Sequence, residues 1–183
     1  HPLVYLTVRF GEGEEGAANQ EKVVIELYSA VCPETCARFA SLCGAGVVAG
    51  AGSYRGTRFH RVVRDGWVQG GGGSGGGDAH SGEEAAAPYN GGYSFETFAV
   101  RFDRPGMVAF ASDGVGGGGG ASNSSQFFVS LAPLPFMDFS AVAFGRVVKG
   151  LDAFRRMSEL ETLNECPIVH CQIVDCGAAT AAD

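Results

Sequence analysis

The chain has 183 residues and a formal net charge of −7, from 13 Lys and Arg against 20 Asp and Glu. This length is enough to bury one substantial core, which predicts a single domain over residues 1–183. The acidic balance argues against a nucleic-acid partner and an anionic membrane surface, since both are bound by clustered Lys and Arg. No apolar run approaches the roughly 20 residues of a membrane helix, which predicts a soluble protein.

The six cysteines and four histidines show no metal-ligand spacing. No Cys-x-x-Cys pair occurs and the histidines are scattered, so we expect no metal and no cofactor. A chain of this size does not need disulfides, and free cysteine behaves as a small hydrophobic residue. We therefore expect buried, reduced thiols and a cytoplasmic location, with an organellar leader ahead of His1 left open.

The first half of the chain predicts two strands, a helix and a third strand. Apolar and β-branched runs at residues 3–10 and 22–28 predict strands joined as a hairpin. Apolar residues spaced three and four apart over 34–43, after Pro33 and before Gly44, predict a helix. A strand pattern begins at Phe59, and the small, glycine-rich residues 70–92 then predict a long loop.

The second half returns to strands. Strand patterns occur at residues 106–111, 125–131 and 141–148, with a second glycine run at 116–120. A helix is predicted over 151–160 and a closing strand over 167–175. Many short strands with two short helices predict a mainly β domain whose sheet closes to remove its edges. Composition alone does not choose between a barrel and a sandwich.

Residues 59–71, Phe-His-Arg-Val-Val-Arg-Asp-Gly-Trp-Val-Gln-Gly-Gly, place one cation and one amide among apolar strand residues. Together with Ser-Gln-Phe-Phe at 125–128 and Phe-Gly-Arg-Val at 144–147, this segment resembles the cyclophilin family of peptidyl-prolyl isomerases. The resemblance runs from Val4 to Gly177. It implies a closed eight-stranded antiparallel barrel capped by two α-helices, and cofactor-free isomerisation of X-Pro bonds in proline-containing peptides and in folding proteins.

Arg61 is the predicted catalytic residue. Its guanidinium stays charged and can donate a hydrogen bond to the proline nitrogen as the amide twists. On a regular strand its side chain would share a face with Phe59 and Val63. The residues and the resemblance together predict substrate contacts, and the positions are Val63, Trp67, Gln69, Ala111, Ser112, Gln126, Phe128, Phe136 and Met137.

Arg61 cannot supply the whole rate enhancement. Rotation about an X-Pro bond takes tens to hundreds of seconds uncatalysed, and millisecond turnover requires roughly five decades, or about 7 kcal/mol. A hydrogen bond from a charged donor contributes about 1.5 to 3 kcal/mol. The rest has to come from an apolar pocket that holds the proline ring and fits the twisted amide best.

Four positions depart from the pattern of the family. Gly66 stands where a phenylalanine is usual and Trp67 where a methionine is usual, while Phe136 replaces a tryptophan and Ala141 a histidine. Loss of the indole N–H donor predicts weak cyclosporin binding. We expect reduced rather than abolished isomerase activity. The alternative is a non-catalytic proline-peptide binding or scaffold module in a larger complex.

The glycine runs do not predict a nucleotide site. Neither ends in the Gly-Lys-Ser/Thr of a P-loop, and neither lies between a strand and a helix with a following ribose-binding acid. Flexible loops explain them. A closed barrel leaves no sheet edge that demands a partner, so we expect a monomer.

Overall fold

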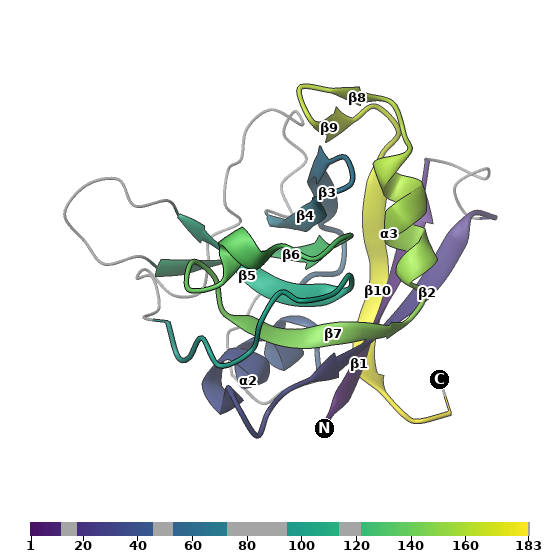
Figure 1. The fold of residues 1–183 in the computed structure, drawn as a ribbon. Helices are drawn as coiled ribbons and strands as arrows, with labels where there is room; N and C mark the ends of the chain where they lie inside the picture. Colours follow the sequence, from purple (N-terminus) through teal and green to yellow (C-terminus); the bar gives the residue numbers. More distant parts are fainter. Residues whose placement is uncertain (12–17, 46–52, 73–94, 114–121, 183) are drawn as a thin grey trace.

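The computed structural model describes residues 1–11, 18–45, 53–72, 95–113 and 122–182, and its main feature is a closed barrel (Figure 1). Every neighbouring pair of strands is antiparallel. The predicted eight-stranded barrel is therefore confirmed. In order around the barrel the strands are β1 (Leu3–Phe10), β10 (Cys171–Ala179), β3 (Arg58–Val63), β4 (Trp67–Gly72), β6 (Ser122–Ser130), β5 (Met107–Asp113), β7 (Ala143–Lys149) and β2 (Gln20–Leu27).

Alternation along the strands builds the core. In β1, Val4, Leu6, Val8 and Phe10 are at most 3% exposed, while the residues between them are half-buried. Successive side chains of a strand point to opposite faces, so this period of two places one face inside the barrel. β1 pairs with β2 directly, which confirms the predicted hairpin.

Two α-helices pack on different sides of the barrel (Figure 1). Each inserts an aromatic ring into the core. Helix α2 spans Pro33–Leu42 and helix α3 spans Leu151–Ser158, close to the predicted ranges. Phe39 of α2 and Phe154 of α3 are both 0% exposed and belong to the same core cluster. Pro33 is tolerated because the first helical N–H has no intrahelical acceptor.

The chain between α3 and β10 differs from the prediction. The expected strand over 167–175 begins only at Cys171. Pro167 belongs instead to a two-stranded hairpin, β8 (Thr162–Leu163) with β9 (Cys166–Pro167), which lies beyond β3 in Figure 1. Strands of two residues carry too little pattern to be recognised from sequence.

Some predictions fall outside the described residues. The loop predicted over 70–92 lies largely there, although β4 continues through Gly72, and the glycine run 116–120 lies there entirely. Within the described part of the chain, no helix is long and apolar enough to cross a membrane. All six cysteines carry free thiols, of which Cys32, Cys36, Cys43 and Cys171 are buried.

Candidate active site

One row of side chains crosses the outer face of four adjacent strands. Arg61 of β3 is paired with Gln69 of β4, Gln69 with Phe128 of β6, and Phe128 with Ala109 of β5. Directly opposite residues share one face of a sheet. We call Arg61, Gln69, Phe128 and Ala109 the outer row.

The residues directly next to the outer row on the same four strands form a second row, which faces the interior. Val62, Val68, Val129 and Val108 are paired in the same order and are all at most 3% exposed. This valine row fixes the register, because a one-residue slip would turn it towards solvent. The core thereby places the outer row on the outside of the barrel.

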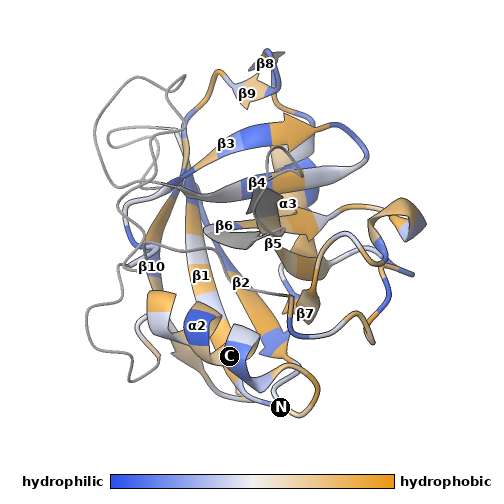
Figure 2. Ribbon diagram, turned by 90° about the vertical axis from the view of Figure 1, so that its left-hand side faces the viewer, coloured by the Kyte–Doolittle hydropathy of each residue, from blue (hydrophilic) through white to orange (hydrophobic). Residues whose placement is uncertain are grey.

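Arg61 does not share a face with Phe59, contrary to the prediction. Phe59 is paired with Gly70 and Arg61 with Gln69, so β3 has one extra residue, His60, in this stretch. Such a bulge re-aims the side chains that follow it. Phe59 therefore lies in the core at 2% exposure, whereas Arg61 points outward with Val63, which is paired with Trp67. In Figure 2, β3 accordingly carries a hydrophilic stretch beside hydrophobic ones.

Gln69 lies next to Arg61 on the neighbouring strand, and its side chain contacts that of Gln126. Gln69 Nε2 donates to Gln126 Oε1 at 2.8 Å. Gln126 precedes Phe128 by two residues on β6 and is half-buried. Tyr54, at 1% exposure, donates from its hydroxyl to the Ser125 carbonyl at 2.8 Å and so fixes this part of β6 from the core side. The pair presents amide groups that can hydrogen-bond a peptide backbone beside the guanidinium.

Phe128 is the apolar centre of the outer row. It is 4% exposed, and Phe102 stacks on it with ring centroids 5.8 Å apart and planes at 15°. A second hydrophobic cluster surrounds it on the outside of the barrel, separate from the core. Its buried members are Phe102, Met107, Ala109, Phe128, Leu134, Ala141 and Ala143, with Val100, Trp67, Met137 and Tyr28 packed against them.

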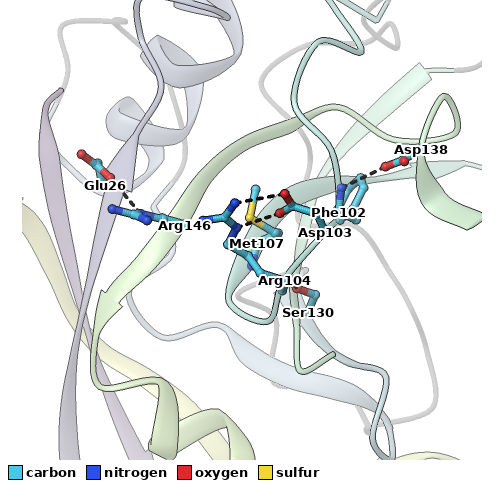
Figure 3. Close-up of polar contacts among 8 residues, drawn as sticks. All are labelled: Glu26, Phe102, Asp103, Arg104, Met107, Ser130, Asp138 and Arg146. Atoms are coloured by element: carbon cyan, nitrogen blue, oxygen red, sulfur yellow. Dashed lines mark hydrogen bonds and ion pairs between the residues drawn. The ribbon is translucent and has the colours of Figure 1, made fainter. Parts of the chain in front are cut away.

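Polar contacts hold the segment that carries Phe102 against this cluster (Figure 3). The Phe102 N–H donates to Asp138 Oδ1 at 2.9 Å. Ser130 is fully buried, and its hydroxyl accepts from the Met107 N–H at 3.0 Å and donates to the Arg104 carbonyl at 3.2 Å. Ser130 thus satisfies the buried Met107 N–H and links it to the Arg104 carbonyl.

We expect Ser130→Ala to lower the free energy of unfolding by about 1 to 3 kcal/mol, because it leaves the Met107 N–H buried and unsatisfied. Urea titration measures this change. Ser140→Ala, at an exposed serine of the same region, is the matched control and should change stability by less than about 0.5 kcal/mol. Equal effects of the two substitutions would contradict the assigned role of Ser130.

Trp67 lies between the Arg61 guanidinium and the apolar cluster around Phe128, which we call the apolar floor. Its ring centroid is 6.3 Å from that of Phe128, and the Arg61 Cζ lies 5.5 Å from the indole. Beside it, Gly66 is buried, and a Cβ there would lie 3.1 Å from Val63 Cγ1. A side chain at position 66 would therefore press on Val63, and the indole of Trp67 supplies the ring surface in this region.

The remaining predicted positions lie around the row. Met137 packs on the Phe128 cluster from the 3₁₀ helix η1 (Pro135–Met137), but Phe136 of the same helix is 66% exposed. Ala111 is half-buried in β5, where the pairing with β6 shifts register, and Ser112 is paired through its backbone with Asn123. The structure thus brings Arg61, Val63, Trp67, Gln69, Gln126, Phe128 and Met137 together.

Glu165 is a site residue that sequence reasoning missed. Its Oε2 accepts from Arg61 Nε at 2.6 Å, and both side chains are about half exposed. Asn164 and Glu165 form the turn of the β8–β9 hairpin, with φ of 50° and 65°. Two such angles in a two-residue hairpin turn favour Asn-Gly, and Asn164 is the one sequence signal of this turn.

The Glu165 conformation is energetically unfavourable in isolation. A left-handed backbone costs a residue with a side chain roughly 1 to 2 kcal/mol. A solvent-exposed ion pair typically returns only about 0.2 to 1 kcal/mol. Stability therefore does not account for glutamate at this position.

Comparison with known proteins agrees with this geometry. The family model described as "Cyclophilin type peptidyl-prolyl cis-trans isomerase/CLD" matches residues 15–178. The chain belongs to the cyclophilin family. Its barrel and its two capping helices are those implied by the sequence resemblance.

Several curated cyclophilins are similar to the chain. "Probable inactive peptidyl-prolyl cis-trans isomerase-like 6" of Bos taurus is 36% identical over 160 residues, covering 85% of this chain and 49% of that protein. Its Homo sapiens namesake is 32% identical over 181 residues, covering 97% and 54%. "Peptidyl-prolyl cis-trans isomerase D" of Mycosarcoma maydis is 33% identical over 185 residues, covering 98% and 44%. The cyclophilin chain thus spans about half the length of these relatives.

His60, the bulge residue of this cyclophilin barrel, has a perturbed acidity. Burial lowers the pKa of His60, while hydrogen bonds with the Arg58 backbone and the Gln126 side chain partly oppose the shift. A histidine with a lowered folded pKa binds its proton first in the unfolded state, so stability is present above the usual pKa and is lost as pH falls. His60 is thus favoured in its neutral form beside Arg61.

We expect the free energy of unfolding to fall between pH 7 and pH 5, and the fall to be smaller in His60→Gln. The comparison isolates the proton of His60, because the other titrating groups are common to both proteins. Urea titrations at several pH values measure the difference. Parallel pH profiles for the wild type and His60→Gln would show that His60 has the same pKa in the folded and the unfolded state.

Proposed function

We propose that this cyclophilin is a slow, cofactor-independent peptidyl-prolyl cis-trans isomerase acting on X-Pro bonds in peptides and proteins. Arg61 donates to the proline nitrogen as the amide twists, and Phe128 with Trp67 and Met137 holds the ring. Gln69 and Gln126 bind the neighbouring peptide groups. Each role uses a group that the reaction needs, and none requires a nucleophile or a proton transfer.

The outer row is the observation that carries this proposal. It places a permanently charged donor and a buried aromatic floor on one face, with two amides between them. The valine row beneath it fixes the strands, so the donor and the floor are held by the same core. A preorganised arrangement favours the twisted amide without reorganisation during the reaction.

A non-catalytic proline-binding or scaffold module is the second candidate. The Arg61 Nε–H is already engaged by Glu165, which favours this candidate. Relatives of this chain also carry names that call them probable inactive isomerases. Gly66 and Trp67, which differ from the residues usual in the family, also change the shape of the surface that would bind the proline ring. A module of this kind would use the outer row for binding alone.

Exchange NMR on a short Ala-Pro peptide separates the two candidates. An isomerase at substoichiometric concentration produces cis/trans exchange cross-peaks that are absent from the free peptide. A pure binder shifts the peptide resonances without increasing the exchange rate. Binding without added exchange would replace the proposed isomerase by the binding module.

Ligand selection follows from the same residues. We propose proline-containing peptides or proteins as ligands and weak binding of cyclosporin, because Phe136 lacks an N–H donor and its ring is 66% exposed. The monomer remains a proposal, supported by the pairing of every barrel strand on both of its edges.

A further inference from the structure

Glu165 and Arg61 are brought together by backbone contacts as well as by charge. The Val62 N–H donates to the Glu165 carbonyl at 2.7 Å, which ties the tip of the β8–β9 hairpin to β3 beside Arg61. The Glu165 carboxylate therefore reaches the guanidinium from a fixed position. Arg61 Nε then donates to it at 2.6 Å.

Arg61 also contacts residues of the barrel face. Arg61 lies over the Trp67 ring, with Cζ 5.5 Å from its centroid, and is paired across strands with Gln69. Glu165 thus approaches from the hairpin, while the apolar floor and the amides lie on the barrel side. These barrel contacts remain when the carboxylate is removed.

We propose that Glu165 restrains Arg61 and lowers the isomerase rate of this site. This inference rests on the proposed function. The carboxylate occupies one guanidinium donor and weakens the positive field at the place where the twisted amide needs it. Glutamate at the left-handed turn position is explained by this role, since a glycine there would relieve the backbone and leave Arg61 unpaired with the hairpin.

Glu165→Gln tests the inference because it removes the charge and keeps the size of the side chain. We expect kcat/KM on a neutral, end-capped proline peptide to rise about two- to fivefold, the range of an exposed ion pair. Glu165→Gly should give at least the same increase and should also raise the melting temperature. Salt should raise the wild-type rate towards that of Glu165→Gln and leave the variant unchanged, because screening weakens an exposed ion pair.

Two control substitutions separate charge and backbone effects. Glu161→Gln removes an exposed carboxylate four residues earlier. Asn164→Gly relieves the neighbouring left-handed residue, whose φ is 50°, without touching the ion pair. Both should leave kcat/KM within experimental error of the wild type. The Arg61 Nε–Hε resonance should move upfield in Glu165→Gln and stay in place in both controls.

The outcomes distinguish this inference from the proposed function. Wild-type turnover that is unchanged by Glu165→Gln, or an Arg61 Nε–Hε resonance that does not move, would overturn the inference alone. Absence of turnover in both the wild type and Glu165→Gln, with or without peptide binding, would remove the proposed isomerase and this inference with it. A rise in rate confined to Glu165→Gln and Glu165→Gly supports the inference.

Discussion

Arg61→Ala is expected to lower kcat/KM for a proline peptide by about 10- to 150-fold, because one charged hydrogen bond contributes about 1.5 to 3 kcal/mol. The loss should not be complete, since the Phe128 floor and the Gln69–Gln126 pair remain in place. A protease-coupled assay of the purified protein measures the rate. Peptide affinity should fall much less than the rate if the arginine acts chiefly on the twisted amide.

The fold should tolerate Arg61→Ala, because the side chain is 45% exposed and its ion pair with Glu165 is exposed as well. Arg64→Ala is the matched control, since Arg64 is an exposed arginine just after β3 and lies outside the outer row. We expect this control to retain the wild-type rate. Arg61→Lys keeps a charge without the planar fork of donors, and it should recover only part of the rate. An Arg61→Ala protein that retains more than half of its activity would contradict the assignment of Arg61.

Phe39→Ala is expected to lower the free energy of unfolding by about 3 to 5 kcal/mol, the range for removing a buried phenylalanine. Phe39 lies on α2 with no exposed surface, and its ring is surrounded by others. The neighbouring rings, with centroid distances, are Phe144 at 4.9 Å, Phe127 at 5.2 Å, Tyr54 at 5.3 Å and Phe110 at 6.1 Å. Ring deletion therefore opens a cavity between α2, the strands β5, β6 and β7, and Tyr54, which precedes β3.

Urea unfolding measures the effect of Phe39→Ala, and Phe136→Ala is its control, because Phe136 is 66% exposed and should cost little. Total stabilities are typically about 5 to 15 kcal/mol, so Phe39→Ala can approach the folding threshold. Phe39→Leu keeps most of the volume and should cost less than Phe39→Ala while remaining folded. A Phe39→Leu protein as stable as the wild type would show that the aromatic cluster does not depend on this ring.

The barrel was predictable because strand periodicity and a family resemblance agree along the chain. The prediction matched β1 at both ends, whereas β10 begins four residues later than predicted. The β8–β9 hairpin was missed because each strand has two residues and because Glu165 stands at a turn position that commonly holds glycine. A strand of two residues is too short to show an alternating pattern of apolar and polar residues.

Part of the candidate site was predictable from the sequence, but Glu165 and the orientation of Arg61 were not. Arg61, Gln69, Gln126 and Phe128 were identified by residue type and motif, and the register brings them together. The outward direction of Arg61 depends on the bulge at His60, where β3 has one residue more than β4 between two paired positions. A single strand read alone shows no such bulge.

Contacts between segments far apart in the chain could not be predicted from the sequence either. Glu96 accepts from the backbone N–H groups of Glu34 at 3.1 Å and Thr35 at 2.9 Å, and so caps α2 from more than 60 residues away. The packing of Phe102 on Phe128 likewise joins β6 to a segment without regular structure. Such contacts follow from the closed barrel and not from local spacing.

A titration of ¹⁵N-labelled protein with an Ala-Pro peptide, compared with its Ala-Ala counterpart, tests the central claim most directly. The account predicts that the proline peptide shifts the resonances of the Gln69 and Gln126 side-chain amides, the Trp67 indole and the Arg61 Nε–Hε. The control peptide should shift them much less. Equal shifts with both peptides, or shifts confined to β1 and β2, would contradict a proline-binding site over the outer row.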